Sequence, residues 1–471
     1  MSFISAPFVM LVAVVIAVQA ALRTVRAQNL WVLGASLVFY GWTHPLLVGL
    51  LLASALLDYA CGLELEARPQ RRRAVIAASV VGNLGVLLLF KLQDWFVQPA
   101  ALALEAIGLP ASHEVLALGM PLGLSFFTFQ TLGYTLDVAS GRLRARRDVV
   151  DYLLFVCFFP QLVSGPIEQG SDLLPQLEQR RTLDPTRLAR GLSLAAWGAF
   201  KKVCVADAVA THVDVMLLAA DPGPGMVLVG GVGFGVQLYA DFSGYTDMAR
   251  GVAHALGVRL SHNFDRPFLA LSTPDFWRRW HITLTRWVGD HVFTPLARGG
   301  TAGPLRLAGA LVATYVVIGL WHGLEVRFLV FGLVHAASAL VATFAGPLLP
   351  RGWSGSRVAR AAAIALHTLV VLIPTGILFR DSSLLRAREH LGALLGNQSG
   401  LQADAALATA GPLAVALVVL IFGAWIGPRA QVALARSRWG LVGHGAWWAV
   451  AAVLVLAMAG DRAPDFLYFR F

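Results

Sequence analysis

Apolar segments of membrane-spanning length recur from one end of the chain to the other, and they restrict the fold more than any other feature. A helix that crosses the hydrocarbon core of a bilayer needs about 20 residues. Charged residues make up only 14% of the 471 residues, against about 25% in ordinary soluble proteins. Because lipid cannot satisfy backbone polar groups, such segments must be helical. We therefore expect an all-α polytopic membrane protein with apolar segments at 6–22, 30–43, 46–65, 74–92, 114–138, 187–216, 224–240, 305–321, 328–347, 360–379, 411–427 and 444–460.

The number and continuity of these segments predict the domain organisation. Residues 152–167 are apolar but contain Pro160, Gly165 and Pro166, so we expect a re-entrant or kinked segment there. Together the segments predict about ten to twelve transmembrane or re-entrant helices. No internal repeat and no low-complexity linker divides the sequence. Residues 1–471 are therefore expected to form a single integral-membrane domain.

The basic residues predict the orientation of the chain. The net charge of +10 comes largely from short clusters between apolar runs, which is typical of membrane-protein loops and does not favour nucleic-acid binding. An even number of expected spans separates the clusters at 23–26, 68–73 and 142–147, and the positive-inside rule makes their common side cytoplasmic. No basic residue precedes the first apolar run, so we expect no signal peptide. The N-terminus is therefore predicted on the outer side of the membrane.

Residues 273–290 combine basic and aromatic side chains in a pattern that predicts one amphipathic helix at a membrane interface. Thr273, Pro274 and Asp275 supply a capping hydroxyl, an early proline and an acid near the positive end of the helix dipole. The expected helix has a polar stripe and an opposing aromatic side. His281 lies on the aromatic side and should face the protein interior. The stripe consists of Arg279, Thr283, Arg286 and Asp290, and the opposing side of Trp277, Trp280, His281, Leu284 and Trp287.

His322 is a second candidate for reaction chemistry. A helix that begins near Arg306 would bring His322 close to the far edge of a bilayer core about 30 Å thick. Gly319 and Gly323 flank the histidine and allow either a close backbone approach or a break in the helix. A buried, neutral imidazole can accept a proton, which suits a general base.

Asp241 and Ser243 lie where an apolar segment meets the polar stretch ADFSGYTDMARG. Ionisable groups at membrane depth usually face a cavity or a partner. The same two residues would also cap or turn the backbone around Gly244, and the sequence leaves both interpretations open.

Motifs of soluble-enzyme chemistry are missing from the sequence. It contains no HExxH metal motif, no GxSxG nucleophile elbow and no Walker-type phosphate loop. The three cysteines have no ligand-like spacing. We therefore expect no bound metal and no disulfide.

Nine short motifs follow one another along most of the chain: YGWTHP (40–45), PLGLSFFTFQTLGYTLDV (121–138), FFPQLVSGPI (158–167), AFKKVCVAD (199–207), DFSGYTDMARG (241–251), NFDRPF (263–268), FWRRWHITLTRW (276–287), GLWHG (319–323) and LFRDSSL (378–384). In this order they resemble the membrane-bound O-acyltransferase family, and most of all its bacterial alginate O-acetyltransferase and teichoic-acid D-alanyl-transfer branch. The resemblance implies helices that ring a central funnel with two histidines near its narrowest point.

The resemblance also implies roles for individual residues. The catalytic histidine of the family falls on His322, and a second characteristic polar residue, a histidine in this branch, falls on His281. We further expect donor or substrate binding by a small set of neighbouring residues, although Arg278 and Arg279 suit surface anchoring equally well. This set consists of Trp321, Asp241, Ser243, Arg278 and Arg279. The chain departs from the family after GLWHG, where Glu325, Val326 and Arg327 replace a small residue, a polar residue and a tryptophan.

The resemblance implies an O-acyltransferase that moves an acetyl group from a cytoplasmic thioester, such as acetyl coenzyme A, toward a hydroxyl of an exported polysaccharide. It implies no permanently bound cofactor and an extracytoplasmic acetyltransferase as a partner protein. Two other functions stay open. Buried histidine and aspartate also serve proton relays in transporters, so the chain would suit an export or relay subunit. It would equally suit a scaffold for an extracytoplasmic transferase.

Overall fold

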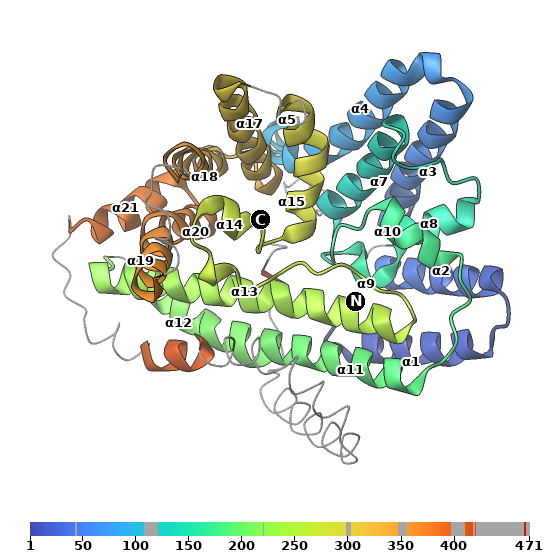
Figure 1. Ribbon diagram of the computed structural model, residues 1–471, viewed down its shortest axis with the longest axis horizontal. Helices are drawn as coiled ribbons and strands as arrows, with labels where there is room; N and C mark the ends of the chain where they lie inside the picture. Colours follow the sequence, from blue (N-terminus) through green and yellow to red (C-terminus); the bar gives the residue numbers. More distant parts are fainter. Residues whose placement is uncertain are drawn as a thin grey trace. The chain divides into compact units, whose positions relative to one another are not determined.

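A computed structural model describes residues 1–42, 45–107, 121–219, 221–297, 303–346, 356–396, 410–417, 420 and 466–467 (Figure 1). The regular elements formed by these residues are helices, and the β pairing among them is a single isolated bridge between Phe264 and Trp280. The all-α prediction is confirmed. The chain folds into two compact units, Met1–Ala189 with Val252–Ser261 and Arg190–Gly251 with His262–Phe471. Whether they act as the expected single domain stays a prediction.

The first unit consists of helices that mostly follow the apolar runs, and three of them begin at polar caps. Side chains of Ser5, Thr24 and Asp148 accept hydrogen bonds from first-turn N–H groups. The kinked segment predicted at 152–167 is confirmed as a break between α8 and α9. The elements are α1 (Ala6–Ala21), α2 (Val25–Gly41), α3 (Leu46–Ala67), η1 (Pro69–Arg71), α4 (Arg72–Lys91), α5 (Gln93–Ala106), α7 (Leu124–Ala139), α8 (Val149–Cys157), α9 (Phe159–Leu162) and α10 (Gly170–Leu177).

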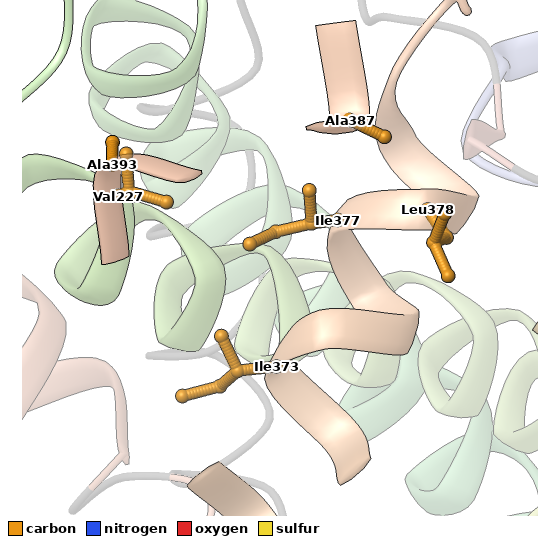
Figure 2. Packing of buried hydrophobic residues seen from close by; sticks show 6 residues of the cluster. All are labelled: Val227, Ile373, Ile377, Leu378, Ala387 and Ala393. Carbon is orange, nitrogen blue, oxygen red and sulfur yellow. The ribbon is translucent and has the colours of Figure 1, made fainter. Parts of the chain in front are cut away.

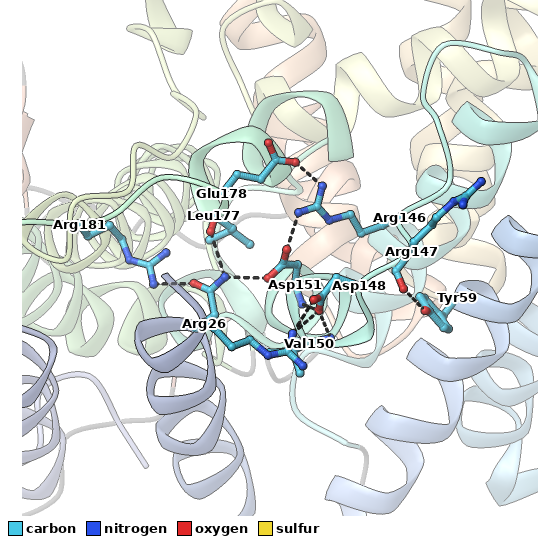
Figure 3. A network of polar contacts seen from close by, with 11 residues as sticks. Arg26, Tyr59, Arg146, Arg147, Asp148, Val150, Asp151, Leu177, Glu178 and Arg181 are labelled. Carbon is cyan, nitrogen blue, oxygen red and sulfur yellow. Dashed lines mark hydrogen bonds and ion pairs between the residues drawn. The ribbon is translucent and has the colours of Figure 1, made fainter. Parts of the chain in front are cut away.

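A polar network joins several helix ends of this unit (Figure 3). Arg26 forms an ion pair of 2.5 Å with Asp148, and Tyr59 donates a hydrogen bond of 2.5 Å to the carbonyl oxygen of Arg147. Arg146 pairs with Asp151. The basic clusters at 23–26 and 142–147 therefore lie at the same end of the unit. This agrees with the prediction that both clusters are on one side of the membrane. That this end is cytoplasmic stays a prediction.

A second polar cluster is buried between three helices of the first unit. Asp58 on α3 is fully buried and accepts hydrogen bonds of 2.5 Å from Asn83 on α4 and 2.5 Å from Thr135 on α7. Ser79 on α4 also donates to it. Buried polar groups require such partners, so the cluster ties three helices together.

The second unit contains the histidine candidates. It contains most of the longest described helix, α13, which has 32 residues and whose last turn belongs to the first unit. The elements are α11 (Pro185–Phe200, which begins in the first unit), η2 (Lys201–Asp207, a π-helix), α12 (Ala208–Leu217), α13 (Pro224–Ala255), η3 (Pro267–Leu269), α14 (Thr273–Trp277), α15 (Ile282–Val288), η4 (Gly289–Phe293), α16 (Thr294–Ala297), α17 (Pro304–His322), α18 (Val326–Ala345), α19 (Arg357–His367), η8 (Thr368–Leu372), α20 (Ile373–Arg380) and α21 (Leu384–Leu394).

A small apolar core holds α20 and α21 against α13 (Figure 2). Ile373 and Ile377 project from α20 toward Val227 of α13, and each is at most 3% exposed. Leu378 of α20 and two alanines of α21, Ala387 and Ala393, complete the cluster. The packing positions the last turn of α20, which contributes Phe379 to the site described below.

Six helices of the described chain are long and apolar enough to cross a membrane: Leu46–Ala67, Pro69–Lys91, Pro224–Ala255, Pro304–His322, Val326–Ala345 and Arg357–Arg380. The prediction of a multi-pass membrane protein is confirmed. The predicted segment 444–460 and most of 411–427 lie outside the described residues, as does the start of 114–138. The predicted total of ten to twelve helices therefore stays a prediction.

Candidate active site

His322 is the last residue of α17, and close packing of α17 against α18 holds it in place. A Cβ atom on Gly319 would lie 2.3 Å from the carbonyl oxygen of Phe328, and one on Gly332 would lie 2.6 Å from that of Tyr315. Glycine alone permits this approach. The helix ends before Gly323, whose backbone is extended. Both roles predicted for the flanking glycines, close approach and helix break, are confirmed.

The imidazole of His322 lines a mostly apolar cavity of about 280 Å³ in the second unit. The side chain is buried, and its ring centroid lies 4.9 Å from those of Trp321 and Phe379 and 5.8 Å from that of Phe331. These rings come from α17, α18 and α20. A group in such surroundings is shielded from water and can bind an apolar reactant.

The helix predicted at 273–290 is interrupted, which corrects the amphipathic interpretation. The first piece, α14, ends at Trp277, and α15 begins at Ile282. His281 between them has φ 44° and ψ 54°, a left-handed conformation that is uncommon for a residue other than glycine. The polar stripe and the aromatic side therefore do not form the two faces of one helix. The predicted inward position of His281 is confirmed, because its side chain is 0% exposed.

The interruption has a tertiary cause that local periodicity cannot reveal. The backbone N–H of Asp265 donates 2.9 Å to the carbonyl oxygen of Arg279, beside the bridge between Phe264 and Trp280. A second hydrogen bond caps α15: the backbone carbonyl oxygen of Asn263 accepts from the N–H of Ile282 at 3.0 Å. The asparagine is the first residue of the motif NFDRPF, but no local pattern predicts its role.

The side chain of Asn263 also contacts His281. Its Oδ1 atom lies 3.3 Å from Nδ1 of His281, and it accepts hydrogen bonds from the backbone N–H (3.1 Å) and hydroxyl (3.0 Å) of Thr283. Burial lowers the pKa of His281 to about 3, so the ring is neutral at physiological pH.

Trp321 brings the two predicted histidines to one place. Its ring centroid lies 5.8 Å from that of His281 and 4.9 Å from that of His322. His281 also packs against Phe242 of α13, at 4.9 Å. The indole is buried, so both imidazoles lie against one buried tryptophan.

Arg278 and Arg279 form ion pairs with a neighbouring acid. Asp275 lies 2.9 Å from Arg279 and 3.7 Å from Arg278. The Arg278 side chain is 71% exposed. Neither arginine lines the cavity beside His322.

The predicted capping role of Thr273 is wrong. The N-cap of α14 is Ser272, and Thr273 is the first residue within the helix. Its hydroxyl instead donates 2.8 Å to Ser338 of α18 and lies 3.2 Å from His367. Tertiary partners therefore replace the local capping interaction.

Asp241 and Ser243 lie inside α13, which continues to Ala255. The predicted segment 224–240 was too short, and the interpretation of the two residues as a cap or turn is wrong. The reason is the π-helix η2, whose lysines supply partners for the polar groups. Lys202 lies 2.8 Å from Asp241, and Lys201 donates 2.9 Å to Ser243.

Two residues near the end of the chain also reach this region, and no local pattern predicted them. The N–H of Leu467 donates 2.8 Å to Oδ2 of Asp241. The ring of Phe466 lies 4.9 Å from Tyr245 and 5.7 Å from Phe242. Since Phe242 packs against His281, Asp241 anchors a segment that adjoins the histidine site.

A further histidine lines the cavity. His335 is buried on α18 and accepts a hydrogen bond of 3.3 Å from the indole N–H of Trp277. It is thus a packed polar residue. Within the described part of the chain, no cluster of three or more His, Cys, Asp or Glu side chains could hold a metal ion. The prediction of no bound metal stays a prediction.

The model of the membrane-bound O-acyltransferase family matches residues 139–367, which include both histidines. The chain is 32% identical over 375 residues to a probable alginate O-acetylase of Pseudomonas fluorescens, covering 78% of this chain and 70% of the relative. It is 35% identical over 319 residues to a probable alginate O-acetylase of Azotobacter vinelandii, covering 67% of this chain and 63% of that one.

A relative named for another function is similar to the chain at a comparable level of identity. The chain is 32% identical over 346 residues to a peptidoglycan O-acetyltransferase of Helicobacter pylori, covering 66% of this chain and 64% of the relative. The matched part of the chain spans 60 to 64% of the length of three of the alginate O-acetylase relatives. These matches confirm the family resemblance carried by the nine motifs.

Proposed function

Because the chain belongs to the membrane-bound O-acyltransferase family, we propose that it is a membrane-embedded O-acyltransferase. It transfers an acetyl group from a cytoplasmic thioester toward a hydroxyl of an exported, alginate-like polysaccharide or of a partner protein. The observation that carries the proposal is the position of His322, buried at the end of α17, beside an apolar cavity and against the tryptophan that also contacts His281.

The reaction requires a base next to the attacking hydroxyl. The hydroxyl oxygen attacks the thioester carbonyl carbon, and its proton passes to His322 as the C–O bond forms. Collapse of the tetrahedral intermediate breaks the C–S bond, and the departing sulfur takes a proton back from His322. His281 either orients a reactant or donates a hydrogen bond to the developing oxyanion.

The remaining components of the proposal concern the donor, the acceptor and the membrane. Acetyl coenzyme A or another acyl thioester acts as a substrate, and no cofactor is held permanently. An extracytoplasmic acetyltransferase completes the transfer to the polymer. The chain lies in the bacterial inner membrane with its N-terminus outside. The relatives named for alginate and peptidoglycan O-acetylation support a polymer as final acceptor.

The proposal is tested by supplying a thioester with a labelled acetyl group to membranes that contain either the wild-type chain or His322→Ala. We expect labelled polymer or partner protein with the wild type and a loss of at least about 100-fold with the variant, the scale of removing a general base. His212→Ala, on α12, is the matched control and should transfer at the wild-type rate. Equal labelling by His322→Ala would overturn the assignment. Transfer by the purified chain alone would separate an enzyme from an export or relay subunit.

A further inference from the structure

We infer that Asn263 is a positioning residue that fixes which ring nitrogen of His281 carries the proton, and so makes Nε2 of His281 a hydrogen-bond acceptor for a reactant. The inference rests on the proposed acyl transfer. It selects one of the two roles left open for His281, that of orienting a reactant.

The neighbours of Asn263 determine the orientation of its side-chain amide. Oxygen and nitrogen of an asparagine side chain are distinguished by their hydrogen-bond partners. The backbone N–H of Thr283 can only donate, and it points at the Asn263 side-chain atom 3.1 Å away. An amide NH₂ in that place would set two donors against each other. The atom is therefore the carbonyl oxygen Oδ1.

The orientation of the amide in turn determines which ring nitrogen of His281 carries the proton. Nδ1 of His281 lies 3.3 Å from the same oxygen. A carbonyl oxygen cannot donate, so Nδ1 must carry the hydrogen in this contact. A neutral imidazole has one such hydrogen, which leaves Nε2 with a lone pair. Burial keeps His281 neutral by lowering its pKa to about 3.

The position of the proton on His281 determines which hydrogen bonds the ring can make with a reactant. An unprotonated Nε2 repels a developing oxyanion, so His281 in this tautomer cannot act as an oxyanion donor. It can accept a hydrogen bond from an O–H or N–H group of the bound acceptor or donor, other than the proton that His322 removes. The histidines then differ in function: His281 orients a reactant, and His322 carries the proton. Asn263 acts on the reaction only through His281.

Asn263 is suited to this task because it also holds the backbone on which the ring is mounted. It accepts from the N–H groups of Ile282 and Thr283, the first two residues of α15, and thereby caps the helix from a distant loop. The left-handed backbone of His281 is thus held on its C-terminal side by the same residue that contacts its ring.

The test uses the full-length protein in nanodiscs, with histidine labelled by ¹⁵N in the ring. The His281 resonances are identified as those lost in His281→Gln. We expect a protonated, pyrrole-type signal for Nδ1 and an unprotonated, pyridine-type signal for Nε2. A proton on Nε2 in the wild-type protein, in either the other tautomer or the imidazolium, would overturn the inference.

Variants then separate positioning from folding. Asn263→Ala should shift His281 toward the Nε2-protonated tautomer and lower the transfer rate about 100-fold, the scale of lost orientation. Asn263→Asp keeps an oxygen for Nδ1–H and for the α15 cap, and should restore Nδ1 protonation. Thr285→Val removes a hydroxyl that bonds only weakly to Trp280, at 3.4 Å. This control on the same helix should leave spectrum and rate unchanged.

The outcomes also separate this inference from the proposed function. If Asn263→Ala loses activity with the His281 tautomer unchanged, Asn263 is merely structural and the inference fails. If the wild-type chain shows no His322-dependent transfer, the proposed function fails, whereas the tautomer assignment is still decided by the spectrum.

Discussion

Lys202 and Asp241 face each other inside the second unit, where neither charge can be removed without exposing the other to an apolar interior. Asp241 is 1% exposed and the Lys202 side chain 8%. Asp207 lies 2.8 Å from the same ammonium group. One lysine therefore compensates two carboxylates, and Asp241 in turn binds the N–H of Leu467.

We predict that Lys202→Met lowers the free energy of unfolding by about 3 kcal/mol or more, because it leaves the buried carboxylate of Asp241 without a cation. Unfolding in detergent, followed by circular dichroism, measures the change. Arg71→Met is the control, because Arg71 is 61% exposed where it pairs with Glu64, and such surface pairs contribute about 1 kcal/mol or less. Equal losses for both variants would contradict the prediction.

The residues of the site differ in how far sequence could reveal them. His322 and His281 stand out because each is a polar group in apolar or aromatic surroundings. Asn263 and Leu467 do not, because their roles depend on partners 18 and 226 positions away in the chain. Hydrogen bonds over such separations leave no local pattern.

At the scale of elements, the contact between α17 and α18 depends on glycines. Helix α17 contains one glycine that cannot be replaced without moving α18 and another that can. A Cβ atom on Gly319 would meet the backbone of Phe328 at 2.3 Å, whereas one on Gly309 would meet nothing within 4 Å. Backbone cannot yield as a flexible side chain does, so α17 and α18 must separate if Gly319 is replaced.

We predict that Gly319→Ala lowers both the unfolding temperature and the rate of acetyl transfer, since it displaces the end of α17 that carries His322. Gly309→Ala should be neutral or raise stability by up to about 1 kcal/mol, the advantage of alanine over glycine in a helix. Thermal unfolding and the labelled-acetyl assay measure both effects. Similar behaviour of the two variants would show that close packing does not position His322.

Long apolar runs predict the ends of helices well. Where polar residues follow or interrupt such a run, the predicted helix can be either too short or too long. The helix predicted at 305–321 is found at Pro304–His322, because a continuous apolar run permits little else in a membrane. The predicted helix at 224–240 was too short, because lysines of η2 satisfy its polar continuation. The predicted helix at 273–290 was too long, because the loop around Asn263 supplies hydrogen bonds that compete with helical ones.

At the scale of the whole molecule, the orientation in the membrane is the property that the arginine clusters predict. Arg26 and Arg147 lie at one polar end of the first unit, through contacts with Asp148 and Tyr59. The positive-inside rule assigns this end to the cytoplasm. An odd number of predicted spans separates it from the N-terminus.

We predict that Arg144→Cys is labelled by a membrane-impermeant maleimide only after spheroplasts are permeabilised, whereas Ser2→Cys is labelled in intact spheroplasts. Both side chains are exposed. The unmodified chain is the control for its own thiols, of which Cys61 and Cys157 are buried. The reverse pattern of labelling would invert the predicted topology.

The short connection between α17 and α18 has a consequence for how the protein is made. Residues 323–325 alone join the two helices, and their glycine contacts need no other part of the chain. Such a hairpin can enter the bilayer as one preassembled body, because small residues let its helices associate directly in lipid. His322 then travels at the tip of the hairpin. Its depth in the membrane is set during insertion, before the helices that complete the cavity have been synthesised.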